Sequence, residues 1–289
     1  MTRAEVKTFW DETTGSWQYV VHDPATRKGA IIDPVLDFDQ QSGSVVTRNA
    51  ERILDYVKEA GLDIVWVLDT HPHADHFSAA HWLAQRLDAP RGIGEKVTGV
   101  QELWADFYHT PEFPCDGRQW DNLFADGDTF AVGELEGRVM FTPGHTLASV
   151  SYVIGDTAFV ADTLMMPDVG TSRADFPGGS SSELYDSLQR LLSLPDETRL
   201  FIGHDYAPGD RDAACEATVA EHEADNAHLA GDVSKADYQN TRDARDDTLP
   251  LPDIMLYALQ VNIRGGRLPE PESNGCSYLK VPVNLFEPR

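Results

Sequence analysis

The residues with the clearest chemistry lie in one six-residue stretch of the sequence, HPHADH, at positions 71–76. Four of its side chains are common metal ligands, namely His71, His73, Asp75 and His76. Imidazole and carboxylate groups suit zinc, non-haem iron and manganese. Burying four such groups without partners would cost several kcal/mol, so they are not ordinary core residues. The stretch therefore predicts a metal site.

Three further candidate ligands each follow a short apolar run that predicts a β-strand. His145 lies in FTPGHT, where Pro143 and Gly144 end the run. Asp162 follows TAFVA, and His204 follows RLFIG. Ligand sites in open α/β sheets lie beyond the carboxyl ends of strands, so these three side chains are expected to converge with the HPHADH loop.

The elements that position these residues follow from the pattern of apolar side chains. The continuous apolar run at 64–70 predicts a buried strand directly before HPHADH. Residues 48–60 place Ile53, Leu54 and Val57 on one helical face. Further strands are predicted at 6–10, 17–22, 29–32, 128–132, 137–142, 149–154, 157–161 and 199–203, and helices near 78–88, 181–193 and 211–230.

Strands and helices alternate from end to end, which favours sheets covered by helices within one domain spanning residues 1–289. Residues 97–127 are rich in aromatic side chains and are interpreted as an insertion. Residues 231–250 are polar and charged, and we interpret them as a solvated segment that opens a C-terminal extension near 231–289.

The order of the motifs carries a resemblance to a known family. H-x-H-x-D-H is followed by G-H-T, by a strand-ending Asp and by G-H-D, over nearly the whole chain. This arrangement resembles the metallo-β-lactamase superfamily. The resemblance implies an α/β fold, an αββα sandwich of two mixed β-sheets flanked by helices, with the metal at the edge where loops from both sheets meet.

Two branches of that superfamily match the ligand pattern. Persulfide dioxygenases are mononuclear Fe(II) enzymes that oxidise glutathione persulfide with O₂, whereas glyoxalase II enzymes are binuclear zinc hydrolases of glutathione thioesters. The segment TSRADF after Asp162 and the later NIRGG resemble the dioxygenase branch. The resemblance thus favours a persulfide dioxygenase that forms sulfite. A zinc thioesterase, another hydrolase and a non-catalytic metal-binding protein stay open as alternatives.

The resemblance also assigns the ligands. It places one Fe(II) per chain on His71, His145 and Asp162, a triad of two histidines and one carboxylate. The other four candidates would orient this triad: His73, Asp75, His76 and His204. In the hydrolase alternative, His71, His73 and His145 hold one Zn(II), Asp75, His76 and His204 hold a second, and Asp162 bridges the two ions.

Three residues near these motifs are candidates for binding substrate. Arg173, in TSRADF, would meet an acidic residue or a substrate carboxylate, with a structural ion pair as the alternative. Arg264, in NIRGG, could bind a glutathione carboxylate, because a guanidinium group matches a carboxylate in two hydrogen bonds; capping a buried carbonyl is its alternative. Tyr206, just past His204, would close the pocket or only pack.

The composition bounds the partners of the chain. It has 48 Asp and Glu residues against 23 Lys and Arg, which gives a formal net charge of −25. Such a surface repels phosphate backbones and anionic lipids, so neither nucleic acid nor a membrane is expected as a partner. The same acidity suits either a salt-adapted source or an ordinary acidic protein.

The expected location is the cytoplasm. The sequence shows no secretory signal and no apolar run near the roughly 18 residues that a membrane span needs. Its three cysteines, Cys115, Cys215 and Cys276, form no metal-binding or disulfide pattern. From the resemblance we expect a small-molecule persulfide, glutathione and O₂ as partners, and a homodimer as the assembly.

Overall fold

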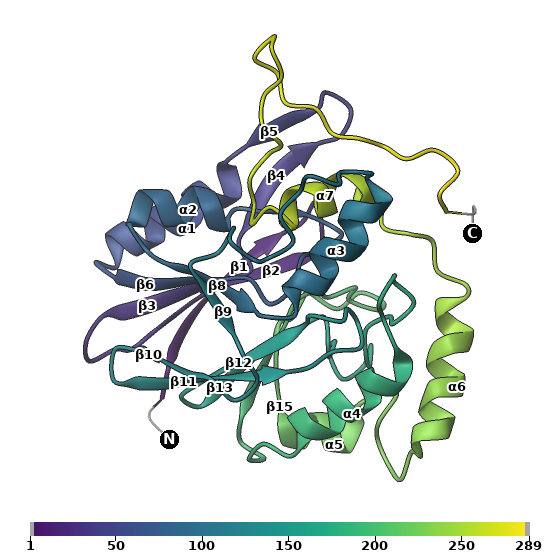
Figure 1. The fold of residues 1–289 in the computed structure, drawn as a ribbon. Coiled ribbons are helices and arrows are strands. Elements are labelled where there is room, and N and C mark those ends of the chain that lie inside the picture. Colours follow the sequence, from purple (N-terminus) through teal and green to yellow (C-terminus); the bar gives the residue numbers. More distant parts are fainter. Residues whose placement is uncertain (1–2, 287–289) are drawn as a thin grey trace.

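Two mixed β-sheets of six strands each pack face to face, with helices on their outer surfaces (Figure 1). The computed structural model describes residues 3–286. In order across the first sheet, the strands are β1 (Glu5–Asp11), β2 (Ser16–His22), β3 (Lys28–Ile32), β6 (Asp63–Leu68), β8 (Arg91–Gly94) and β9 (Asn122–Phe124). Across the second sheet they are β10 (Thr129–Val132), β11 (Leu135–Phe141), β12 (Val150–Ile154), β13 (Thr157–Ala161), β14 (Arg199–Ile202) and β15 (Glu216–Thr218).

Both sheets mix parallel and antiparallel pairs. In the first, β1, β2 and β3 are antiparallel neighbours, whereas β3, β6, β8 and β9 run parallel. In the second, only the β13–β14 pair is parallel. A small third sheet has the order β5 (Ser44–Val46), β4 (Val35–Asp39) and β7 (Phe77–Ser78). The predicted pair of mixed sheets is confirmed.

Seven helices lie among the described residues. They are α1 (Arg48–Glu59), α2 (Ala80–Leu87), α3 (Val97–Phe107), α4 (Ser181–Leu192), α5 (Val219–Asp225), α6 (Lys235–Asp246) and α7 (Met255–Asn262). Helices α1 and α2 cover the first sheet, and α4 covers the second (Figure 1). None of the helices between residues 3 and 286 is long and apolar enough to cross a membrane.

Three apolar layers hold the sandwich together. Between the sheets, Tyr19 and Ile32 of the first pack with Tyr152, Phe159 and Phe201 of the second. The outer layers lie under the helices, where apolar residues recur at helical spacing. Under α1 these are Ile53, Leu54 and Val57, and under α4 they are Leu184, Leu188 and Leu191. This is the predicted αββα arrangement.

The segment predicted as a solvated excursion is instead largely the helix α6. Its N-terminus is capped by Ser234, whose side chain accepts a hydrogen bond from the Asp237 amide. The buried side of α6 carries Tyr238, Arg242 and Asp246. Two of these three are charged, so hydrophobic periodicity could not reveal the buried face.

Two other segments also differ in detail from the predicted elements. Residues 211–230, predicted to be helical, form strand β15 and the short helix α5, which begins at a capping box of Thr218 and Glu221. Residues 97–127 supply α3 and the edge strand β9 of the first sheet. The predicted 1–289 and 231–289 ranges include residues 1, 2 and 287–289, which lie outside the described residues.

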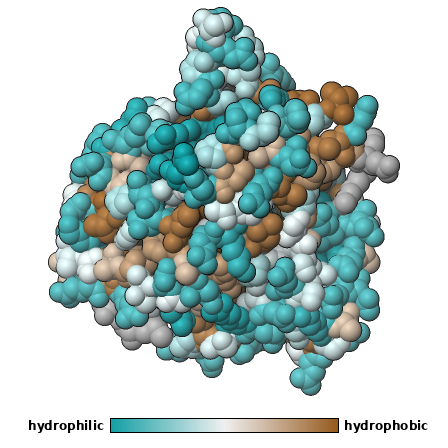
Figure 2. All heavy atoms as spheres, viewed as in Figure 1, coloured by the Kyte–Doolittle hydropathy of each residue, from teal (hydrophilic) through white to brown (hydrophobic). Residues whose placement is uncertain are grey.

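The visible surface is mostly hydrophilic, in keeping with the acidic composition (Figure 2). Apolar side chains gather at the upper right of this view, where the chain approaches its C-terminus in Figure 1. Exposed apolar residues of the final segment include Tyr278, Val281, Val283 and Leu285.

Candidate metal centre

All seven predicted ligands lie in loops that follow strands. The HPHADH stretch links β6 to β7, and His145 lies between β11 and β12. Asp162 follows β13 directly, and His204 comes two residues after β14. Because β13 and β14 run parallel, their carboxyl ends bring Asp162 and His204 to the same edge. The predicted convergence of these loops is therefore present in the structure.

The first group of ligands consists of His71, His145 and Asp162, all of them buried. One carboxylate oxygen, Asp162 Oδ2, lies 3.9 Å from His71 Nε2 and 3.6 Å from His145 Nε2. Zinc ligands lie about 2.0–2.2 Å from the ion, so atoms that share an ion stand about 3–4 Å apart. These three side chains are therefore spaced to hold one ion.

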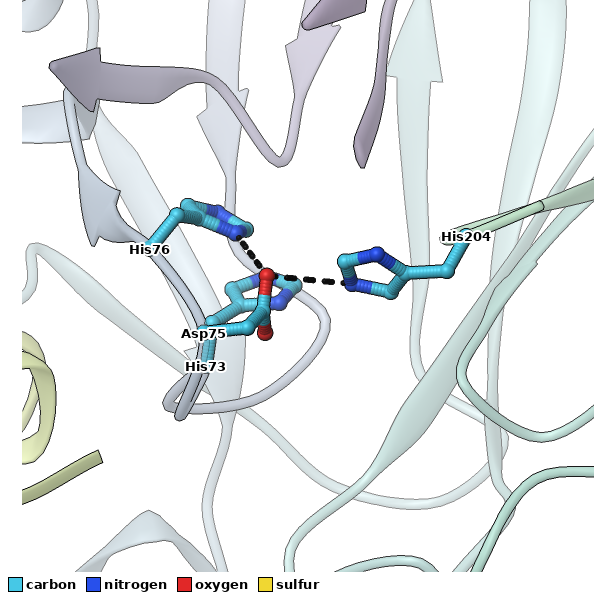
Figure 3. A group of neighbouring side chains, drawn as sticks. All are labelled: His73, Asp75, His76 and His204. Atoms are coloured by element: carbon cyan, nitrogen blue, oxygen red, sulfur yellow. Dashed lines mark hydrogen bonds and ion pairs between the residues drawn. The ribbon is translucent and has the colours of Figure 1, made fainter. Parts of the chain in front are cut away.

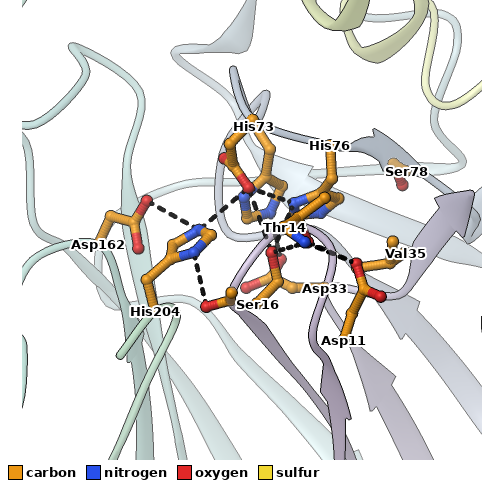
Figure 4. Close-up of polar contacts among 12 residues, drawn as sticks. Asp11, Thr14, Ser16, Asp33, Val35, His73, His76, Ser78, Asp162 and His204 are labelled. Atoms are coloured by element: carbon orange, nitrogen blue, oxygen red, sulfur yellow. Dashed lines mark hydrogen bonds and ion pairs between the residues drawn. The ribbon is translucent and has the colours of Figure 1, made fainter. Parts of the chain in front are cut away.

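The second group consists of His73, Asp75, His76 and His204 (Figure 3). Asp75 Oδ2 lies 2.8 Å from His76 Nδ1 and 3.2 Å from His204 Nε2. His204 Nε2 is also 3.5 Å from Asp162 Oδ2, so the two groups adjoin (Figure 4). His73 falls with the second group here, whereas the hydrolase alternative pairs it with His71.

Backbone carbonyls orient two of the imidazole rings. His145 Nδ1 is 2.9 Å from the Arg173 carbonyl oxygen, and His204 Nδ1 is 3.0 Å from that of Gly15. A carbonyl only accepts hydrogen bonds, so each Nδ1 carries the proton and each Nε2 lone pair faces the centre when the ring is neutral. Such outer partners hold metal-binding histidines in a single tautomer.

Asp33 is a functional residue that sequence reasoning missed. It follows β3, and its Oδ1 lies 3.0 Å from His73 Nε2. It also accepts hydrogen bonds from the Thr70 amide and hydroxyl. The ion pair places Asp33 against the Nε2 side of His73, and with Asp69 these two residues form a further group spaced to hold an ion. The sequence feature that could have revealed Asp33 is its place directly after an apolar strand, which Asp162 shares.

Unpartnered buried atoms show that a metal ion fits the centre. His71 Nε2, His73 Nδ1, His76 Nε2 and Asp162 Oδ1 are buried and have no hydrogen-bond partner among the described residues. An unsatisfied buried polar group costs about 1–3 kcal/mol, and more when it is charged. Two of these residues belong to each ligand group, and a cation held by such a group would supply the missing partners.

The charges of the centre govern the protonation of two histidines. Burial opposes the imidazolium form of His204, but Asp162 and Asp75 outweigh it and raise the pKa to about 10. Burial also lowers the pKa of His73, but the nearby carboxylates, chiefly Asp33, raise it by more, so the pKa is about 9. In contrast, burial lowers the pKa of His71, which leaves that ring neutral and ready to ligate.

These pKa values predict a steep pH dependence for any second ion. Ligation needs neutral imidazole, so an ion bound by His73 and His204 must displace a proton from each. Its affinity should rise with pH, by up to about 100-fold per unit while both rings stay protonated. The rise should end above the pKa of about 10. Zn(II) competition titrations of the metal-free protein at pH 7 and pH 9 measure this, and equal affinities would contradict it.

Asp162 can occupy its position because residue 203 is a glycine and has no Cβ atom. A Cβ atom at residue 203 would lie 2.4 Å from Asp162 Oδ1 and 3.1 Å from the Ala161 carbonyl carbon. Gly203→Ala should therefore displace the carboxylate and weaken metal binding by about 10-fold or more. Gly99→Ala is the control, because its Cβ would meet only a flexible Leu147 methyl group at 3.2 Å. Metal content after dialysis against a chelator compares the two variants, and equal retention would refute the close-approach argument.

A narrow apolar pocket adjoins the first group of ligands. Its lining includes His145 together with Val100, Trp104, Phe176 and Leu259. The ring centroids of His145 and Phe176 are 5.2 Å apart. The His145 ring therefore borders a small pocket lined mostly by apolar side chains.

The three predicted substrate residues lie in different surroundings. Arg173 forms two hydrogen bonds with Asp175, at 2.7 and 2.9 Å, and donates a third to the Pro250 carbonyl. Arg264 donates to the Gln260 carbonyl, and its guanidinium lies 4.7 Å from the centre of the Phe113 ring. These are the structural contacts named as alternatives. The substrate-binding roles of both arginines remain predictions.

Tyr206 lies beside the second group of ligands. Its ring is nearly parallel to that of His204, with centroids 6.2 Å apart, and 69% of the residue is exposed. The side chain is thus placed at the mouth of the centre. Whether it contacts substrate also remains a prediction.

The fold and the centre define the class of protein. A model of the metallo-beta-lactamase superfamily matches residues 13–204, so the chain belongs to this superfamily. Its clustered His and Asp residues are those of the superfamily's metal site. The chain thus has the metallo-β-lactamase fold and His and Asp clusters that could hold metal ions.

Particular relatives carry two kinds of name. A beta-lactamase hydrolase-like protein of Agrobacterium fabrum is 60% identical over 98% of this chain, which spans 65% of that protein's length. Glyoxylase B2 of Dictyostelium discoideum is 42% identical over 99% of both chains. Persulfide dioxygenase ETHE1 of Bos taurus is 27% identical over 87% of this chain and 84% of that protein. The crystal structure of ETHE1 from Myxococcus xanthus is 31% identical with a TM-score of 0.72, and the match covers 91% of this chain and 100% of that one.

Proposed function

We propose that this enzyme is a persulfide dioxygenase with one Fe(II) held by His71, His145 and Asp162. The observation that carries the proposal is the division of the ligands into two groups. The triad forms one group, which adjoins the second where Asp162 Oδ2 lies 3.5 Å from His204 Nε2, and in the second group Asp75 contacts His76, His204 and Ser16. Two histidines and a carboxylate are the ligand set of non-haem Fe(II) oxygenases.

The segment after Asp162 also supports the proposal. Its TSRADF motif prompted the resemblance to the dioxygenase branch, and the Arg173 carbonyl within it accepts the hydrogen bond from His145 Nδ1. The motif thus contributes directly to the orientation of a triad ligand. The likeness to the Myxococcus ETHE1 structure over that whole chain points the same way.

The proposed reaction consumes a persulfide, O₂ and water, and yields a thiol, hydrogen sulfite and a proton. The terminal sulfur is oxidised and O₂ is reduced, and the S–S bond breaks. Bound at the triad, Fe(II) would supply the site at which sulfur and O₂ react. Burial lowers the pKa values of His71 and His145, so both would hold neutral rings toward it; Asp162 would contribute a negative charge, and the apolar pocket borders His145. We propose glutathione as the thiol carrier.

The alternative is a binuclear zinc thioesterase. Asp162 Oδ2 lies within 3.9 Å of Nε2 atoms from both groups, as a bridging ligand requires. The relatives at 42% and 60% identity also carry glyoxylase and hydrolase names. Two zinc ions would supply an activated water, and the products would be a carboxylic acid and a thiol.

One experiment separates the two reactions. Protein loaded anaerobically with Fe(II) receives glutathione persulfide while O₂ uptake and iron content are measured on the same sample, and zinc-loaded protein receives a glutathione thioester. O₂ uptake with about one iron per chain, and slow thioester cleavage, is the expected result for a triad. Rapid thioester cleavage with two zinc ions and no O₂ uptake would overturn the proposal.

The variant Asp75→Asn also distinguishes the mononuclear dioxygenase from the binuclear thioesterase. If Asp75 only orients its neighbours, the protein keeps its iron and loses about 10–100-fold in rate. If Asp75 ligates a second ion that the reaction needs, metal content falls by one ion per chain and turnover is lost. The metal count and the rate together decide between these outcomes.

A further inference from the structure

The C-terminal end of helix α7 lies beneath the HPHADH loop and contacts it through Asn262. This side chain is 2% exposed. Its Nδ2 donates to the backbone carbonyls of His73 and His76, both at 2.7 Å. Its Oδ1 accepts from the Ser78 amide at 2.8 Å. Both amide hydrogens and the amide oxygen of one side chain are thus engaged by the ligand loop and the strand that follows it.

The loop has no regular structure of its own between residues 71 and 76. Its backbone carbonyls would otherwise need water or another partner, because buried backbone groups are nearly always paired. Asn262 supplies these partners from a residue 186 and 189 positions away in sequence. We call the three hydrogen bonds of Asn262 the clamp. The two carbonyls lie on either side of Asp75, so the clamp sets the path of the backbone on both sides of that residue.

The far end of the clamp is itself fixed. The Ser78 hydroxyl donates to Asp69 Oδ1 and accepts from the Ala80 amide at the start of α2. On the helix side, Gln101 of α3 donates to the Ile263 carbonyl, next to Asn262. Asn262 therefore joins the ligand loop to the end of helix α7, which a hydrogen bond from helix α3 holds in place.

We propose that Asn262 is a positioning residue of the metal centre, whose carboxamide holds the HPHADH loop in metal-binding geometry before the ion arrives. It touches neither the ion nor the reacting atoms, and it acts through His73 and His76. A preorganised loop loses less conformational freedom when the ion binds, so affinity rises. The inference rests on the metal centre of the proposed function, and it holds for either reaction.

The chemistry of the clamp explains why an amide is needed. Asn262→Asp keeps the size of the side chain and the acceptor for Ser78, but it replaces the NH₂ donor by an oxygen that faces two carbonyl oxygens. Asn262→Ala removes donor and acceptor together. Both variants should release the loop, and Asp should do so without leaving a cavity.

Gln260 offers a matched control on the same helix. It is 3% exposed, and its amide donates to the Leu256 and Lys280 carbonyls and accepts from the Lys280 amide. Gln260→Ala thus removes a buried amide of the same kind that ties down the C-terminal segment and does not contact the ligand loop. An effect that comes only from the loss of a buried amide should therefore appear in the Gln260 variant as well as in the Asn262 variants.

The test measures metal affinity rather than turnover. Metal-free wild type, Asn262→Asp, Asn262→Ala and Gln260→Ala are titrated with Co(II) against a chromophoric chelator, and the Co(II) absorption spectrum is recorded. We expect affinity about 10–100-fold weaker and an altered spectrum for the Asn262 variants, as for other outer partners of metal ligands. Gln260→Ala should match wild type in both. Wild-type affinity and spectrum in a folded Asn262 variant would overturn the proposal.

A second measurement needs no variant. In metal-free wild type, hydrogen exchange of the Ser78 amide reports whether the clamp exists before metal binds. Protection equal to that of the metal-loaded protein is expected, and protection that appears only with metal would overturn the proposal. Neither readout depends on whether the enzyme consumes O₂ or cleaves thioesters, so failure of the proposed function leaves this test intact.

Discussion

Asp162→Asn is expected to abolish metal retention and turnover together. One oxygen of this carboxylate lies 3.5–3.9 Å from the Nε2 atoms of His71, His145 and His204. A neutral amide contributes no charge and offers a weaker oxygen ligand. The loss should exceed the roughly 100-fold that removal of an outer partner causes.

The measurement for Asp162→Asn is metal content and activity on the same purified sample. Asp186→Asn is the control, because its carboxylate is exposed and pairs with Lys235 of α6 at 2.6 Å. The control should keep metal and activity. Full metal content and full activity in Asp162→Asn would remove Asp162 from the centre under either proposed reaction.

Breaking the Arg242–Asp246 ion pair is expected to lower the free energy of unfolding by about 3–5 kcal/mol. Both side chains are 3% exposed, and Arg242 Nη2 lies 2.6 Å from Asp246 Oδ1. Arg242 also donates to the Thr171 carbonyl, and Asp246 accepts from the Ala174 amide. Removing the Asp246 carboxylate leaves the Arg242 charge buried without this counter-ion, and that uncompensated charge dominates the cost.

Asp246→Asn tests this ion pair, with unfolding in urea as the measurement. The control is Lys235→Ala at the start of α6, which removes an exposed ion pair with Asp186 of α4 and should cost at most about 1 kcal/mol. The double variant Arg242→Met with Asp246→Leu should recover part of the loss, because it leaves no buried charge, while the Thr171 carbonyl and the Ala174 amide lose these partners. A cost for Asp246→Asn no larger than that of the control would contradict the argument.

The same pair bears on the metal centre. Thr171 and Ala174 flank Arg173, whose carbonyl accepts the hydrogen bond from His145 Nδ1. Loosening this segment should therefore weaken metal binding as well as stability. The helix that carries the pair was the segment interpreted from sequence as solvated.

Much of the fold could be predicted from local sequence. The helix predicted at 48–60 is α1 (Arg48–Glu59), and the strand at 64–70 is β6 (Asp63–Leu68). Both have strong apolar patterns that report which face is buried. Helix α6 escaped this reasoning because its buried face contains an ion pair, and buried charge looks like exposed charge in a sequence.

The sequence by itself determined the superfamily and the seven candidate ligands, because each ligand lies in a short motif at the end of a local apolar strand. The tertiary structure alone decided how these ligands divide into two groups and what orients them. Asp33 meets His73, the Arg173 carbonyl meets His145, and Asn262 meets the ligand loop across up to 189 residues. Such contacts depend on how distant segments pack, and packing leaves no pattern in neighbouring residues.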